Sequence, residues 1–338
     1  MSQAKLDIVQ QSDKLSLWGI RLLLASLLVL GGEILLWNNP QIHDPLEWLL
    51  RIIGYVASST LLLDLAVRYR IRNLYDVMTL CVVHVLLVAL LIQPDVAFDV
   101  FPSKFIQRMM GGVGFVSIEM FGVFLVMTRA SVKWGRPLLM GYALAVGFYW
   151  GIWARWSPLR DVSGIEPTTF NIMLAYFCIV GLIVFLLFLG MSRRHSVWQA
   201  THLQLDQREL GAVLIACVLL FLIRLIQGIV SFGGLAFFIV LMALVIGVLY
   251  YRKPEKAQML MDRHFPPQPI QWGWLIIASI IVVMSAFMAY NLPFIALDFV
   301  NQLWILEMAF LGIGGLWLPL IAVIFSTEAM DRQSRTRG

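Results

Sequence analysis

Two ionisable side chains, Glu119 and His84, lie near the middle of long apolar stretches of the sequence. Glu119 is about twelve residues into a predicted helix over 107–129, and His84 is about ten residues into one over 74–94. At about 1.5 Å per residue, both side chains are expected near the midplane of a membrane. The two helices are consecutive and antiparallel, so they are expected to be neighbours. Their geometry therefore allows a contact between Glu119 and His84 at mid-depth.

Ionisable groups inside a membrane are costly and usually functional, and this pair has two interpretations. In the first, Glu119 and His84 bind a proton or a cation, because carboxyl and imidazole groups form the proton relays of transporters. In the second, Glu119 is a neutral carboxylic acid that bonds to a backbone or hydroxyl group and packs helices together. Gly112 and Gly122 share its helix face, and small residues there favour close helix approach.

A second set of polar residues is predicted in the outer half of the membrane. They are Glu33, Arg51, Arg224, Gln227 and Glu307. An unpaired arginine at that depth is costly, so the sequence predicts that Arg224 pairs with Glu307 or Glu33. This set is either an anion-recognising or gating cluster at an outward-facing vestibule, or a structural ion pair that holds two helices together. Asp64 has a different explanation, since Arg68 four residues later predicts an ordinary helical ion pair.

The sequence indicates no cofactor and no metal site. It contains no HExxH metalloprotease motif, no GxSxG nucleophile motif and no phosphate-binding P-loop. His84 is the only histidine within a predicted helix, so a haem held by two histidines is not indicated. Cys81, Cys178 and Cys217 have no CxxC or Cys/His spacing, which is typical of core cysteines rather than of a zinc site. The catalytic residues of any enzymatic activity are therefore unknown.

The elements that position these residues belong to a membrane protein. Of the 338 residues, 60% are hydrophobic and 13% are charged, whereas soluble domains have about 25% charged residues. Apolar stretches of about 20 residues match the hydrocarbon thickness, and their continuity excludes barrel strands. We predict an all-α transmembrane bundle of about ten spans in a single integral membrane domain, 1–338. The predicted helices are 16–37, 46–69, 74–94, 107–129, 134–156, 169–190, 209–230, 233–251, 273–296 and 301–326.

Basic residues predict the orientation of these helices. Eighteen lysines and arginines lie in the terminal segments and in alternate gaps between helices, and four lie in the other gaps. Cytoplasmic loops carry the Lys/Arg excess, so both termini are predicted to be cytoplasmic, with short polar tails over 1–15 and 327–338. The same bias explains the net charge of +5, and no nucleic-acid partner is expected. The expected location is the inner or plasma membrane.

Three functional hypotheses fit this architecture. The first is a permease that moves a small solute or lipid, with proton coupling through Glu119 and His84. The second is a non-catalytic scaffold or membrane subunit of a larger complex, with other membrane subunits docking at the cytoplasmic loops 191–208 and 252–272. The third is an intramembrane enzyme acting on lipid, with Glu119 or His84 as an acid–base group. Membrane lipids are expected partners in all three.

Overall fold

The computed structural model describes residues 3–36, 43–128, 135–156, 169–193, 200–228, 230, 232–252, 260, 270–292, 309, 311–312 and 314–316. No strand occurs among these residues, which confirms the all-α prediction for this part of the chain. Nine of the described helices are long and apolar enough to cross a membrane. By the length and composition of its helices, the chain is a multi-pass membrane protein.

The membrane-spanning segments agree with the predicted ones to within a few residues at most ends. They are Ser16–Leu36, Pro45–Arg68, Leu74–Ile92, Phe105–Thr128, Gly135–Arg155, Phe170–Ser192, Gln207–Ile226, Gly233–Tyr251 and Trp272–Tyr290. The last of these is shorter than the predicted 273–296, because Pro293 disfavours a helical conformation in the residue before it. The tenth predicted helix, 301–326, lies almost entirely outside the described residues, as do the predicted tail 327–338 and most of the loop 252–272.

The chain divides into two compact units, each assembled from three stretches of sequence. Unit 1 consists of Met1–Asp44, Glu119–His202 and His264–Ile305. Unit 2 consists of Pro45–Ile118, Leu203–Arg263 and Leu306–Gly338. Helix α5 (Gly114–Thr128) begins in unit 2 and continues into unit 1 at Glu119. Each unit is described below by itself.

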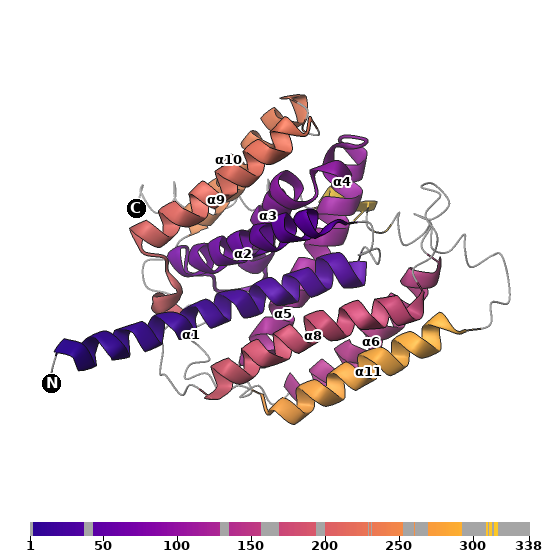
Figure 1. The fold of residues 1–338 in the computed structure, drawn as a ribbon. Helices are drawn as coiled ribbons and strands as arrows, with labels where there is room; N and C mark the ends of the chain where they lie inside the picture. Colours follow the sequence, from indigo (N-terminus) through magenta and orange to yellow (C-terminus); the bar gives the residue numbers. More distant parts are fainter. Residues whose placement is uncertain are drawn as a thin grey trace, which may run out of the picture. The chain divides into compact units, whose positions relative to one another are not determined.

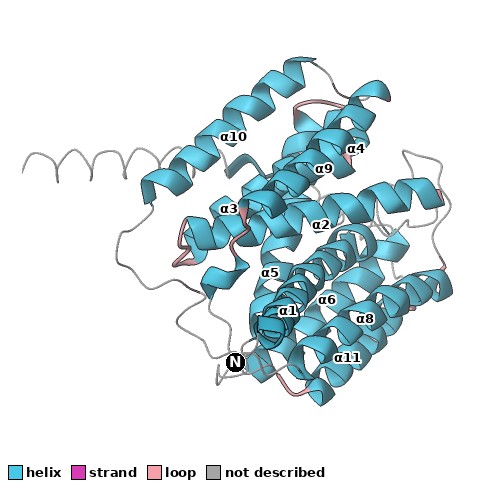
Figure 2. Cartoon of the chain, turned by 60° about the vertical axis from the view of Figure 1, so that its left-hand side comes forward, coloured by secondary structure: helices cyan, strands magenta, loops and turns pink. Residues whose placement is uncertain are grey.

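Unit 1 contains four long helices besides the last part of α5. They are α1 (Gln3–Val29), α6 (Gly135–Trp156), α8 (Phe170–Arg193) and α11 (Trp272–Tyr290). Helix α8 runs alongside α1 and α11, and α11 packs against α6 over most of its length (Figures 1 and 2). Helix α1 starts at Gln3, so the polar segment before the first span is helical.

Small residues explain the close packing of α6 against α11. A Cβ atom added to Gly147 would overlap the Ser285 Oγ and the Val282 carbonyl oxygen, and one added to Gly151 would overlap the Ala286 carbonyl oxygen. The two glycines are four residues apart and therefore lie on one helix face. Without a side chain at these positions the two backbones come close together, which is the usual basis of helix association in membranes.

Unit 2 is built from α2 (Pro45–Arg68), α3 (Leu74–Leu87), the short α4 (Pro94–Phe98), α9 (Gln207–Ile226) and α10 (Phe232–Arg252). Helix α2 packs against α3 and α9, and α3 packs against α10. Asn73 and Asp206 cap α3 and α9, accepting bonds from the N–H groups of Asp76 at 3.0 Å and Glu209 at 2.7 Å. Gly228, at φ 73°, ends α9 in a left-handed conformation and begins the short connection to α10.

Three segments of the spans are π-helical: Leu30–Leu36 after α1, Val88–Ile92 after α3, and Phe105–Val113 before α5. In such a turn each N–H bonds to the carbonyl five residues earlier, as Gln93 N does to Val88 O at 2.8 Å. The carbonyls at the end of a helix have no partner within it, and each such group in hydrocarbon costs several kcal/mol. The segments 30–36 and 88–92 each end a span, so their last carbonyls need donors from outside the helix, whereas Phe105–Val113 continues directly into α5.

Candidate functional site

Glu119 faces a tyrosine from the next helix. The Tyr142 hydroxyl, on α6, donates a hydrogen bond to Glu119 Oε2, on α5, at 3.2 Å. The Glu119 side chain is half-buried, and Tyr142 is its hydrogen-bond partner among the described residues. This is the hydroxyl bond that the second sequence interpretation expected, although Tyr142 was not singled out. A tyrosine in an apolar stretch gives no sequence signal that separates it from an ordinary packing residue.

A second phenol lies on the same helix, seven residues after Tyr142. The Tyr149 ring stacks on Trp153 with the centroids 5.8 Å apart. Its hydroxyl oxygen is buried and has no hydrogen-bond partner among the described residues. Helix α6 therefore carries two phenols on one face, and the hydroxyl of Tyr149 can form a further hydrogen bond.

A cavity of about 120 Å³ lies next to the Glu119–Tyr142 pair within unit 1. Residues of α1, α5, α6, α8, α11 and the π-helical segment 30–36 line it. Tyr142 and Ser279 are the polar side chains of this lining. The Ser279 hydroxyl already donates to the Leu275 carbonyl at 2.9 Å, so the wall is apolar apart from Tyr142. The cavity is open on one side, and an apolar lining of this kind favours small apolar groups over polar ones.

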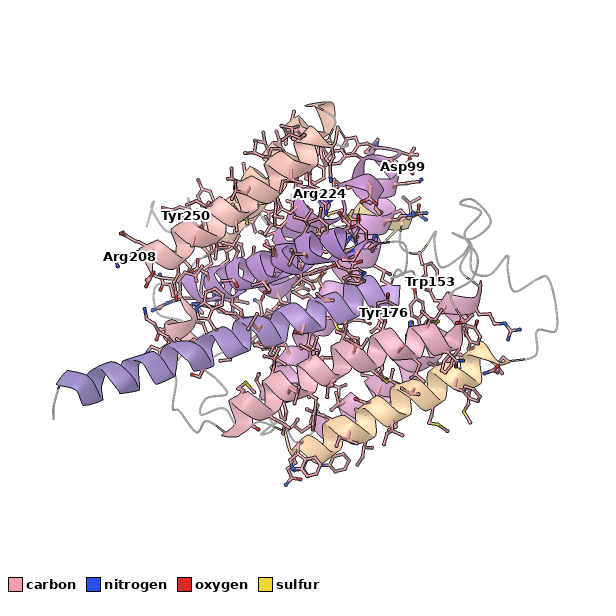
Figure 3. All side chains as sticks on the ribbon, viewed as in Figure 1. Asp99, Trp153, Tyr176, Arg208, Arg224 and Tyr250 are labelled. Atoms are coloured by element: carbon pink, nitrogen blue, oxygen red, sulfur yellow. The ribbon has the colours of Figure 1, made fainter. Side chains whose placement is uncertain are left out.

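Arg224 (labelled in Figure 3) lies on α9 in unit 2. It is buried and uses all five of its N–H groups. Nε donates to the Leu91 carbonyl at 3.1 Å, and Nη2 donates to the Ile92 carbonyl at 3.2 Å. These are the last carbonyls of a π-helical segment. The remaining N–H groups donate to the two Glu47 carboxylate oxygens at 2.7 and 2.8 Å and to Gln227 Oε1 at 3.1 Å. A guanidinium with every donor engaged is a structural clamp in this conformation.

Glu47 connects two of the predicted arginines. Its Oε1 atom also accepts a bond from Arg51 Nε at 2.9 Å, one turn later on α2. The structure thus brings Arg51, Arg224 and Gln227 together around an acid that the sequence analysis did not name. The signal was present, since Glu47 and Arg51 have the i,i+4 spacing of a helical ion pair. Glu47 stands in the first turn of α2, however, where an acidic residue is common for helix-dipole reasons alone.

Two tryptophans donate hydrogen bonds to carbonyls at the end of the π-helical segment 30–36, as Arg224 does at the end of the segment 88–92. Trp150 Nε1 donates to the Ile34 carbonyl at 3.0 Å, and Trp153 Nε1 donates to the Leu36 carbonyl. Trp153 is labelled in Figure 3. Both indoles come from α6, and both are buried. Glu33 lies in this π-helical segment and is 2% exposed. These two tryptophans are among the residues that the sequence analysis did not single out.

The remaining predicted residues are placed as follows. His84 lies in α3 of unit 2, 1% exposed, with its ring 6.3 Å from that of Tyr55, and its Nδ1 atom has no hydrogen-bond partner among the described residues. Glu119 and His84 fall in different units, so their contact stays a prediction. Glu307 lies outside the described residues, and Glu33 belongs to unit 1, so the acid described on Arg224 is Glu47.

The predicted pair of Asp64 and Arg68 is confirmed. Both carboxylate oxygens of Asp64 accept bonds from Arg68, at 3.0 Å from Nε and 3.1 Å from Nη2. The Leu205 N–H, just before α9, donates to the same carboxylate at 2.9 Å. Asp64 therefore also holds the backbone just before α9, within unit 2. The i,i+4 spacing of Asp64 and Arg68 did not indicate this second contact.

Comparison of the chain with protein-family models, with curated proteins and with solved structures found no match.

Proposed function

We propose that this multi-pass membrane protein is a permease that moves a small solute or lipid, with Glu119 as its proton-binding group. The observation that carries the proposal is the partner of Glu119. Among the described residues this carboxyl group forms no ion pair, and its hydrogen bond is to the Tyr142 phenol. A carboxyl group inside a membrane span without a cation beside it is costly to keep ionised and is a functional candidate.

The phenol suits a carboxyl group that gains and loses a proton. A tyrosine hydroxyl can donate to the carboxylate, or it can accept from the carboxylic acid, so the Glu119–Tyr142 bond can persist in both states. Arginine offers donors only. Protonation of Glu47 would remove the negative charge that strengthens its bonds from Arg224 and Arg51, so Glu47 is suited to stay ionised. This difference supports Glu119 rather than Glu47 as the group that cycles.

His84 is the second proton-binding group of the proposal. It is buried in α3, and its Nδ1 atom has no hydrogen-bond partner among the described residues, so this nitrogen is open to a bond from a substrate or a water molecule that reaches it during transport. Its place in unit 2 gives the proposal one titratable group in each unit.

The proposal is tested in liposomes made from a lipid extract of the host membrane, so that lipid substrates are present. A pH-sensitive dye trapped inside reports how fast an imposed pH gradient decays. We expect the wild-type protein to accelerate the decay and Glu119→Gln to return it to the rate of protein-free liposomes, because an amide cannot carry the proton. Tyr142→Phe should slow the decay about tenfold, which corresponds to one lost hydrogen bond.

Matched variants control for effects on folding. Glu209→Gln removes a half-buried carboxyl group in the first turn of α9, and Tyr250→Phe removes an exposed hydroxyl on α10, and both should behave as wild type. Full activity in Glu119→Gln would exclude proton coupling through this residue. A wild-type rate equal to that of protein-free liposomes would contradict a proton-coupled permease for membrane lipid and favour a non-catalytic membrane subunit.

A further inference from the structure

We infer that the cavity in unit 1 binds a segment of the hydrocarbon chain of an amphiphilic lipid, whose polar end lies at the Glu119–Tyr142 pair. The inference rests on the proposed function, because it names the substrate class of the same site. Its first support is the lining. Apart from Tyr142 and Ser279, every lining side chain is aliphatic, aromatic or a thioether, or is the bare backbone of Gly181.

The second support is the size of the cavity. At about 120 Å³ it is slightly smaller than the engineered apolar cavity of about 150 Å³ that binds benzene, and it is open on one side, so it has room for a segment of a chain that continues outside it. A polar solute would lose its hydration in such a space and recover few hydrogen bonds. A hydrocarbon segment, by contrast, regains the dispersion contacts that the lining side chains lack around a void. The cavity therefore selects against sugars, amino acids and inorganic ions.

The third support is the polar end. Tyr142 lines the cavity and also bonds to Glu119, so one molecule could place its chain in the cavity and its head group at the carboxyl group. Met120, Val123 and Met127 extend the apolar face of α5 from the residue next to Glu119. Methionine side chains are flexible and adapt to ligands of different shape. An amphiphile with one hydrogen-bonding head group matches this arrangement.

Gly181 offers a direct way to fill the cavity. It lies in the lining on α8, and a Cβ atom added there meets no other atom within 4 Å. Gly190 lies on the same helix, is exposed, and also leaves its added Cβ without contact within 4 Å. Gly181→Leu should therefore occupy the cavity with little strain, and Gly190→Leu makes the same chemical change on the outside of the helix.

The test uses the full chain in lipid nanodiscs with a photoreactive stearic acid that carries a diazirine on its chain. After illumination, mass spectrometry locates the labelled residues. We expect labelling of cavity-lining residues in α5, α6 and α8, a loss of at least about fivefold in Gly181→Leu, and no change in Gly190→Leu. A second pair on α6 repeats the test: Ala143→Leu fills the cavity, and Ala145→Leu faces outward.

Label confined to outward-facing residues would overturn the inference, and so would undiminished cavity labelling in both Gly181→Leu and Ala143→Leu. The outcomes of the two proposals are separable. Cavity labelling that the filling variants abolish, together with an inactive wild type in the proton assay, would keep the lipid site and reject the permease. A proton flux that depends on Glu119, without cavity labelling, would keep the permease and reject the lipid site.

Discussion

Glu47 and Glu119 are carboxyl groups in membrane spans, and their partners give them different tasks. Glu47 accepts bonds from Arg224 and Arg51, two cations whose hydrogen-bonding groups are all donors. Such an acid is held in one place and one ionisation state, and it ties α2 to α9. Glu119 has one neutral partner, Tyr142, which can bond to either form of the carboxyl group. The first arrangement suits a structural clamp, and the second suits a group that exchanges a proton.

The clamp leads to a prediction for Arg224→Lys. A lysine has three donors at one nitrogen and cannot reach the two Glu47 oxygens, the Leu91 and Ile92 carbonyls and Gln227 at once. At least two of these five acceptors then lose the bond from residue 224, and we expect the free energy of unfolding to fall by about 3 kcal/mol. Thermal unfolding of the purified protein in mild detergent measures the change.

Arg208→Lys is the control, because Arg208 is on the same helix and exposed, so its replacement should leave the melting temperature unchanged (Figure 3). If Arg224→Lys melted together with Arg208→Lys and the wild type, the clamp would contribute nothing measurable. Arg224 would then be available for the anion-binding role that its sequence context also allowed.

The sequence predicts that some residues need a partner but not which residue the partner is, and the reason is physical. Arg224 was recognisable as a residue that needs an acid, because an unpaired guanidinium in hydrocarbon is costly. The sequence did not reveal which acid pairs with Arg224, because Glu47 is 177 residues away and the pairing depends on which helices are in contact. Tyr142 was missed for the same reason. Hydropathy reports the cost of placing one residue in lipid, and it carries no information about the residue opposite.

At the scale of elements, the π-helical segments are the feature that hydropathy could not predict. A span is equally apolar whether its backbone bonds run to the fourth or the fifth preceding residue. Two of the three segments have their terminal carbonyls bonded by side chains of another helix, from Trp150 and Trp153 in one case and Arg224 in the other. At the third segment, a Cβ atom on Gly314 would overlap the Ile106 carbonyl oxygen. Wide turns persist in these spans where neighbouring helices accommodate them.

The α6–α11 pair provides the prediction at this scale. In Gly147→Ala the new methyl group must displace Ser285 Oγ and the Val282 carbonyl, so the helices have to move apart. Overpacking of this kind costs about 1–3 kcal/mol, and we expect a lower melting temperature. Gly141→Ala, on the same helix, is the control. It is exposed and meets no atom within 4 Å, so it should be neutral or stabilise by up to about 1 kcal/mol through helix propensity. Equal melting temperatures for the two variants would contradict the close packing.

For the whole molecule, the sequence predicted where the helices are but not how they group. The nine described spans match the predicted ranges because insertion depends on local length and apolarity, which each stretch carries in itself. The division into two units depends on packing between stretches far apart in sequence, such as α6 with α11. In membranes this packing follows small residues and interhelical bonds rather than hydrophobicity, so a hydropathy pattern does not contain it.

The last prediction concerns the parity of the spans. Nine spans are described, and a tenth is predicted over 301–326. An odd number of spans would put the two ends of the chain on opposite sides of the membrane, and an even number would put them on the same side. The basic residues favour the even number, because eighteen of them fall in the terminal segments and alternate gaps and four in the others. Since Lys/Arg excess marks the cytoplasmic side, both ends should be cytoplasmic.

Reporter fusions in cells decide between the two parities. A fluorescent protein that folds only in the cytoplasm and a phosphatase active only outside it are each fused before Met1 and after Gly338. We expect fluorescence without phosphatase activity at both ends. A reporter inserted in 157–168, a gap predicted on the opposite side, should give the reverse result and shows that each reporter works. Phosphatase activity after Gly338 would mean that 301–326 does not cross the membrane. The excess of arginines at the C-terminal end would then need another explanation, since the positive-inside bias would no longer account for it.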